Sequence, residues 1–488
     1  LSQALIALVI TWILWRAIRS RLVFASLRKL RGPRSSSFVT GNLKQWFSRE
    51  GDGFQKHVAL EYGSVVKIHG MMGRPILYVS DPKALHAILI KEEPIYQESR
   101  AFIDSLLQPP LLKLDLGQYH AKQRKLLNPV FSITHMRRML PIFYNVVYKL
   151  RDAMRTTIEG GKSEMDVLGW TVRVALELIG QGGLGYSFDP LVEDKRDPFA
   201  DAIKAFNPKM VDLAVLRRFI PYLRILGPAW FRRILVDLLP RTWIIRQVVD
   251  LVDTINSRSE QIYEAKKAVL RQGDEVVSKQ LAEGKDIMSI LMRANMAANE
   301  SERLPEEEVL AQITTFTFAA LETTSSTLAR ILHLLSINKD VQQKLREELI
   351  EARAAEGIPY DELDGLPLLD SVCRETLRLY PPATNIVRVA QKDNVIPLSQ
   401  PITTSDGQTL NELFVPQGTE ILIGTYASNV RQDLWGPDAS SGNRSDGHNF
   451  RPLLRTHVYQ VFTPTSRYRL LSWPEREHAS ASSSPRWK

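Results

Sequence analysis

The sequence predicts a mostly α-helical fold with a small β-rich side, and three observations support this prediction. Strand-like runs occur only towards the two ends of the chain, whereas helical patterns fill the middle. With 44% apolar and 24% charged residues among 488, the chain can also bury a large core. Apolar residues recur at three-to-four spacing in six long segments: 117–128, 136–157, 245–270, 305–336, 339–355 and 367–380.

The first fifteen residues, LSQALIALVITWILW, carry no charge and are followed by a cluster of basic residues. Trp12 and Trp15 are typical of the interface zone of a membrane anchor, and positive charge after an anchor favours a cytoplasmic body. We therefore expect an anchor over 1–20, with its start missing because the chain opens on Leu1, and a basic linker rich in Pro, Gly and Ser over 21–45. A signal peptide or a buried helix is the alternative.

The strand signals of the body come in two groups, one near its start and one near its end. Directly after the first group, Ser80 or Asp81 caps a helix that continues to about residue 89, with Pro82 in its first turn. From Ser440 the periodic pattern is lost, and 440–488 is a divergent, Ser-rich tail of low complexity. The predicted strands cover 64–70, 74–80, 384–390 and 418–427.

The charge and motif content excludes several classes of function. The formal net charge of +9 favours an anionic partner such as a lipid surface, but the positive residues are too dispersed to indicate nucleic acid. The sequence has no zinc-type Cys/His spacing and no phosphate-binding loop. A single cysteine also rules out an internal disulfide framework, which fits a reducing compartment.

The centre of segment 305–336 carries the strongest chemical signal. It reads FTFAALETTSSTLA, in which a carboxylate and several hydroxyls interrupt an apolar helix. Glu322 beside Thr323 provides a proton source next to a hydroxyl relay, while Ala319 and Ala320 leave room for a bulky group. The alternative is a solvated helix face with threonine as filler.

A Glu-x-x-Arg pair lies on the last long helix. Glu375 and Arg378 share one face and can form an ion pair there, although exposed pairs of this kind are common. Arg388 follows inside a predicted strand. Cys373 lies about 200° around the helix from Glu375, so we expect it to be a small buried apolar residue rather than a reactive thiol.

His120 and Arg124 form a second candidate pair. They are four residues apart and therefore share a helical face, where they can hold an anionic group together. A basic, solvated helix face is the alternative.

Taken together, these residues resemble the cytochrome P-450 superfamily of haem-thiolate monooxygenases, and especially its fungal, membrane-anchored members. HAKQRKLLNPVFS is similar to the helix in which His120 and Arg124 hold haem propionates, and Arg388 occupies the place of a further propionate-binding arginine. AALETT looks like the oxygen-activation motif, with Ala320 in place of the usual glycine. ETLR is similar to the family's Glu-x-x-Arg clamp, and DLWGPDA (433–439) to the segment that leads towards its haem loop.

The resemblance implies a single catalytic domain over 46–439 that holds haem b. Oxygen would bind over Ala320 and Thr323, and electrons would come from NADPH–cytochrome P-450 reductase. The substrate would be a hydrophobic small molecule of fungal secondary metabolism. The protein would lie in the endoplasmic reticulum membrane with its catalytic domain facing the cytoplasm, in contact with lipid and not with nucleic acid.

The resemblance stops after Ala439. The family continues with an F-x-x-G-x-x-x-C-x-G loop whose cysteine binds the haem iron, but this chain has no cysteine after Cys373 and therefore no metal ligand of that kind. A frameshift, a retained intron or a truncated gene model would explain the loss. Two functions follow: a monooxygenase with its cysteine loop missing, or an inactive, membrane-tethered remnant that binds no haem.

Overall fold

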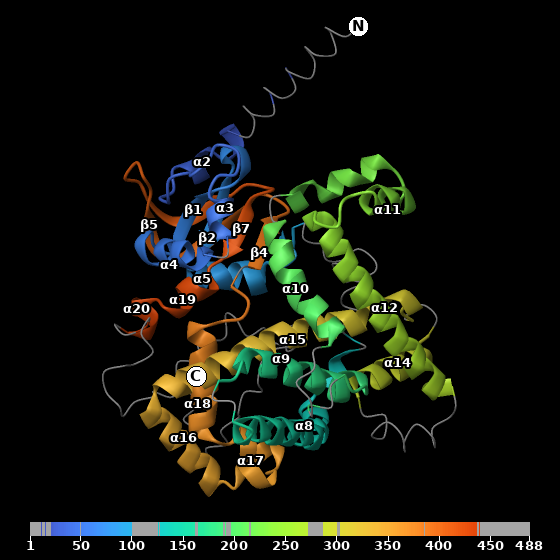
Figure 1. The fold of residues 1–488 in the computed structure, drawn as a ribbon. Coiled ribbons are helices and arrows are strands. Elements are labelled where there is room, and N and C mark those ends of the chain that lie inside the picture. Colours follow the sequence, from blue (N-terminus) through green and yellow to red (C-terminus); the bar gives the residue numbers. More distant parts are fainter. Residues whose placement is uncertain are drawn as a thin grey trace.

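The computed structural model has a β-rich side next to a larger helical body (Figure 1). This arrangement confirms the predicted fold class. The residues that the structure describes are 11, 15, 21–48, 50–99, 125, 127–161, 164–188, 191, 197–213, 216–271, 286–299, 303–384, 386–436 and 439.

Two sheets form the β-rich side. The larger sheet has the strand order β1-β2-β7-β4-β3, in which β2 and β7 run parallel and the other pairs antiparallel. The smaller sheet is the hairpin β5-β6, which the sequence patterns did not indicate. The strands are β1 Val65–His69, β2 Pro75–Val79, β3 Tyr96–Gln97, β4 Ile386–Ala390, β5 Asn394–Thr403, β6 Thr409–Val415 and β7 Glu420–Ile423.

The strand predicted over 418–427 is too long at its C-terminal end. β7 ends at Ile423, and Thr425–Asn429 forms the short helix α19. Gly424 allows this change because the chain turns directly against β2, where a Cβ atom at this position would lie 2.9 Å from the ring of Tyr78 and from the carbonyl oxygen of Val79.

Five of the six predicted helical segments are confirmed, as α8, α12, α15, α16 and α18, while most of 117–128 lies outside the described residues. The α-helices are α2 Ala25–Arg28, α3 Leu43–Trp46, α4 Gly51–Glu61, α5 Pro82–His86, α8 Ile133–Glu159, α9 Val167–Leu178, α10 Pro198–Asp212, α11 Ala229–Asp237, α12 Ile244–Arg271, α14 Ile287–Ala297, α15 Glu306–Ile337, α16 Lys339–Glu351, α17 Tyr360–Asp364, α18 Pro367–Leu379, α19 Thr425–Asn429 and α20 Gln432–Trp435. Short 3₁₀ or π turns are η1 Met71–Gly73, η2 Ala87–Lys91, η3 Asn128–Phe131, η4 Ile179–Leu184, η5 Leu216–Leu226 and η7 Ala354–Glu356.

Asp81, one of the two predicted caps, is the residue that caps α5. Its carboxylate accepts hydrogen bonds from the backbone N–H groups of Lys83 and Ala84. The same carboxylate accepts from the backbone N–H of Ser399 on β5. One buried side chain therefore caps the helix and attaches it to the smaller sheet.

Part of the segment interpreted as a linker, 21–45, belongs to the packed body. Phe24, Leu27 and Leu30 are buried in one apolar cluster with residues of β2 and β5. Burial of three large side chains stabilises this connection by several kcal/mol, at about 1.5–3 kcal/mol for each side chain.

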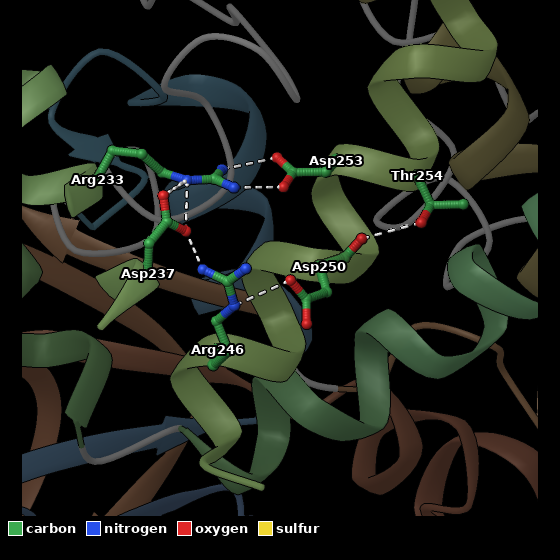
Figure 2. A network of polar contacts seen from close by, with 6 residues as sticks. All are labelled: Arg233, Asp237, Arg246, Asp250, Asp253 and Thr254. Carbon is green, nitrogen blue, oxygen red and sulfur yellow. Dashed lines mark hydrogen bonds and ion pairs between the residues drawn. The ribbon is translucent and has the colours of Figure 1, made fainter. Parts of the chain in front are cut away.

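Helix α11 is linked to α12 by charged side chains. None of its residues is buried, and it follows η5, which also exposes several large apolar side chains. Arg233 of α11 donates to both carboxylate oxygens of Asp253 on α12, at 2.6 and 2.8 Å, and Arg246 of α12 bonds to Asp237 and Asp250 (Figure 2). These ionic contacts join α11 to α12, and the apolar side chains of α11 stay exposed.

Among the described residues, no helix combines the length and the apolar character that crossing a bilayer requires. The anchor predicted over 1–20 lies almost entirely outside them.

Candidate active site

Helix α15 forms the centre of the candidate site. Pro305 precedes it, and three glutamates, residues 306–308, occupy the first turn, where negative charge favours the helix N-terminus. Figure 1 shows α15 crossing the middle of the helical body, and it packs against α9, α10, α12 and α18. These neighbours explain why the helix is largely apolar on several sides.

The hydroxyl groups near the centre of α15 are bonded to its own backbone. Thr323 donates to the carbonyl oxygen of Ala319 at 2.7 Å, and Thr327 donates to that of Thr323 at 2.8 Å. A hydroxyl that donates to the carbonyl oxygen four residues earlier can lie in an apolar helix without an unsatisfied donor. The same hydroxyl can donate to another acceptor if it gives up this bond. Thr323 is therefore positioned as an exchangeable donor on the helix surface.

Ala319 and Ala320 form the open part of α15. Ala319 is exposed and Ala320 half-buried, although the neighbouring Phe316, Thr317 and Leu321 are buried. Because the two side chains are single methyl groups, a flat bulky group can approach the backbone closely here.

Glu322 lies beside this open surface in a partly apolar environment. Burial raises the pKa of Glu322 above its ordinary value, and the positive charge of Lys204 on α10 opposes that shift. The rings of Phe206 and Phe318 meet edge to face at 5.8 Å and fix α10 against α15 at this point. The carboxyl group can therefore hold a proton at a higher pH than an exposed glutamate can.

We expect the Glu322→Gln variant to be more stable than the native chain at neutral pH, by about 0.5–1 kcal/mol. A carboxyl whose pKa is higher in the folded state loses stability as pH rises from its ordinary value through the raised one. The amide cannot ionise, so the difference should vanish under acidic conditions. Urea unfolding at both pH values measures this, with the exposed Glu351→Gln of α16 as the control.

Lower stability of Glu322→Gln at neutral pH would contradict the raised pKa. The expected gain is kept small because Glu322 is only partly buried and solvent screens its charge.

The Glu-x-x-Arg pair on α18, called the clamp below, forms the ion pair that its spacing predicted. Arg378 donates to both carboxylate oxygens of Glu375, at 2.6 and 2.7 Å, and its side chain is only 5% exposed. It also donates to the carbonyl oxygens of Asn429, at 2.6 Å, and Ala439, at 2.7 Å. Its guanidinium lies 5.1 Å from the ring centroid of Trp435.

This clamp attaches the segment after β7 to the helical body. Asn429 returns a hydrogen bond from its amide to the carbonyl oxygen of Arg378, at 3.0 Å, and Trp435 donates to the carbonyl oxygen of Ser428, at 3.1 Å. The structure therefore brings together two parts that the sequence marked separately, the Glu-x-x-Arg pair and the segment that ends at Ala439, and joins them to α19, which the sequence did not predict.

Arg388 of β4 is paired with Glu98, which follows β3. The guanidinium donates to the carboxylate and also to the carbonyl oxygen of Val387. Burial raises the pKa of Glu98, and Arg388 opposes the shift. The other two residues predicted to hold propionates, His120 and Arg124, lie outside the described residues.

Cys373 does not have the properties of an iron ligand. It is partly buried on α18, and burial raises the pKa of its thiol, as does the nearby charge of Asp370. A metal-binding cysteine must be a thiolate. Ala319 and Ala320 leave room for a flat ring and Arg388 is a donor suited to a carboxylate, but Cys373 does not fit the thiolate ligand of the iron.

Four residues of the site carried no sequence signal of their own. Lys204, Glu98, Asn429 and Trp435 act through contacts that only the fold creates. Trp435 alone lay in a stretch marked by the resemblance. Its contact with the guanidinium of Arg378 could not be predicted from the sequence.

Comparison with known proteins identifies the family of the chain. The family model for cytochrome P-450 matches residues 31–441 of the chain. Cytochrome P-450 monooxygenase 81 of Postia placenta is 55% identical over 417 residues, which cover 85% of this chain and 76% of the relative. Monooxygenase 219 of the same fungus is 51% identical over 444 residues, covering 90% and 81%.

A ganoderic acid synthetase of Ganoderma lucidum is 43% identical over 436 residues, which cover 88% of this chain and 79% of that protein. These similarities and the match of the family model confirm the predicted resemblance. The chain belongs to the cytochrome P-450 family.

Proposed function

We propose that this protein is a haem-dependent monooxygenase that oxidises a hydrophobic small molecule with O₂ and electrons from NADPH–cytochrome P-450 reductase. The observation that carries the proposal is the surface of α15, where exposed Ala319 lies next to a partly buried carboxyl with a raised pKa. The similarity to a ganoderic acid synthetase supports a substrate from fungal secondary metabolism.

The protein's own residues have separate tasks in this proposal. Haem b, when bound, supplies the oxidising chemistry. Glu322 holds a proton close to the open surface of α15, and Thr323 offers a hydroxyl donor that can leave the carbonyl of Ala319. Arg388, with His120 and Arg124, would pair with the propionates.

A second function is favoured by one specific observation. The only cysteine of the chain is Cys373 on α18, and burial raises the pKa of its thiol. The second function is therefore that of an inactive, membrane-tethered remnant that does not form a haem-thiolate centre.

The absorption spectrum of the reduced, carbon monoxide-bound chain separates the two functions. The second function predicts that the expressed full chain lacks the haem-thiolate band and that a Cys373→Ser variant gives the same spectrum. A haem-thiolate band would support the active enzyme, and its loss in Cys373→Ser would show that our assignment of this cysteine is wrong. Product formation with added reductase is the second measurement.

We also propose that the protein lies at the endoplasmic reticulum membrane with its catalytic domain in the cytoplasm. Support comes from the uncharged first fifteen residues and from exposed apolar side chains that follow, including Leu22, Val23 and Phe38. The uncovered apolar face of α11 lies at the same end of the molecule as α2 (Figure 1). Both surfaces can contact lipid at once.

Protease treatment of intact microsomes tests this orientation. Trypsin added from outside should digest the body, because its lysines and arginines face the cytoplasm, while alkaline carbonate should fail to extract the undigested chain. Protection of the body until detergent is added would place it in the lumen, and extraction by carbonate would contradict the anchor.

A further inference from the structure

We infer that Glu98 regulates an anion site at Arg388: a carboxylate ligand replaces Glu98 on the arginine, and Glu98 takes up one proton from solvent as it is displaced. The inference deepens the proposed function, because it rests on Arg388 as a binding residue for the carboxylates of a porphyrin. Glu98 does not touch the ligand; it acts on ligand binding through its ion pair with Arg388.

Strand pairing places the two residues together. β3 and β4 pair antiparallel with Gln97 opposite Val389, so the next position brings Glu98 opposite Arg388. The side chains form an ion pair and are 27% and 16% exposed, so solvent reaches both only in part. Any anion that binds to Arg388 must therefore compete with a carboxylate that is already in place.

The charges around the pair make proton uptake the favoured outcome. Burial raises the pKa of Glu98 even with an arginine beside it, so the carboxyl loses its ionised state readily once that arginine is engaged elsewhere. Among the described residues, Arg388 is the one charged group that acts on Glu98. Tyr96 of β3 and Glu92, which follows η2, are both bonded by the amide of Asn394 on β5.

The ligand class follows from the chemistry of arginine. A guanidinium offers several N–H donors in one plane and pairs with carboxylates through two parallel hydrogen bonds. With Glu98 ionised, an incoming carboxylate meets an arginine whose charge is already neutralised and also meets a like charge. We therefore expect Glu98 to weaken carboxylate binding about tenfold at neutral pH.

Protoporphyrin IX and its dimethyl ester are matched probes, because they share one ring and differ in their carboxylates. Fluorescence titration of the full chain with each probe gives the preference for the acid over the ester, and needs no iron ligand. We expect Glu98→Gln to raise affinity for the acid about tenfold at neutral pH and to leave affinity for the ester unchanged. Glu92→Gln, a nearby acid that does not contact Arg388, is the control.

The pH dependence and the proton count complete the test. Native affinity for the acid should fall as pH rises, the Glu98→Gln profile should be flatter, and calorimetry in two buffers should show one proton taken up by the native chain only. Equal affinities in Glu98→Gln and native chain, or no proton uptake, would overturn the inference.

Two further outcomes separate this inference from the proposed function. If neither probe binds, the porphyrin site is absent and the proposed function fails together with the inference. If the probes bind but Arg388→Gln keeps the full preference for the acid, Arg388 is not the anion site and the inference alone is wrong. If Glu98→Gln does not fold, Glu98→Ala at acidic and neutral pH gives the same comparison.

Discussion

The Arg378→Met variant is expected to lose about 3–5 kcal/mol of unfolding free energy, which is a large part of the stability of a typical protein. Arg378 is 5% exposed and donates to Glu375 and to the carbonyl oxygens of Asn429 and Ala439. Methionine fills a similar volume but removes the donor that Arg378 provides to a carboxylate and two carbonyl groups, and the penalty for burying such groups unsatisfied exceeds the value of the bonds themselves.

The measurement is urea unfolding of the detergent-solubilised chain, with Arg374→Met as a matched control on the same helix. Arg374 pairs with Asp370, and both side chains are about one third exposed, at 36% and 31%. We expect that variant to lose less than about 1 kcal/mol. Arg378→Lys keeps the charge but loses the planar fork, so its stability should fall between the two. Equal midpoints for Arg378→Met and Arg374→Met would show that the clamp does not stabilise the fold.

The clamp also shows which contacts sequence patterns can predict and which they cannot. The periodicity of 367–380 predicted the helix correctly, and the spacing of Glu375 and Arg378 predicted their ion pair. It did not predict the bonds from Arg378 to residues 51 and 61 positions away, because no local pattern records which distant carbonyl a buried donor will find. The local half of the clamp was predictable, and the tertiary half was not.

The same limit applies to the anion site. Arg388 was marked by its place in a predicted strand and by the resemblance, but its partner Glu98 lies 290 positions earlier in the chain. Pairing of β3 with β4 depends on the strand order of the sheet, in which β2 and β7 from opposite ends of the sequence are neighbours. Alternation within a strand fixes which face a side chain occupies but not which strand lies beside it.

Loss of Asp286 should be nearly as damaging as loss of Arg378. Its carboxylate pairs with Lys266 at 2.7 Å, with both side chains 4% exposed, and also accepts from the backbone N–H of Ser289 at the start of α14. Lys266 donates in addition to the carbonyl oxygen of Leu184, at 3.0 Å. We expect Asp286→Ala to cost about 3–5 kcal/mol, because it removes a helix cap and leaves a buried ammonium group without its counter-charge.

The pH dependence identifies the cause of that loss. Burial lowers the pKa of Lys266, and Asp286 opposes the shift, so the variant should lower this pKa further. A base whose pKa is lower in the folded state gains stability as pH rises from the folded value towards its ordinary 10.5. The deficit of Asp286→Ala should therefore shrink in urea unfolding experiments between neutral pH and about pH 10. A deficit that does not change with pH would mean that the lost cap, and not the buried charge, is responsible.

A double variant separates charge from capping in the same experiment. Asp286→Asn with Lys266→Met removes both charges and keeps a good capping side chain, since asparagine accepts the bond from Ser289 as aspartate does. We expect it to be more stable than Asp286→Ala, because replacing both partners of a buried ion pair costs less than removing one. If the double variant is the less stable of the two, the unpaired ammonium group of Lys266 is not the dominant cost in Asp286→Ala.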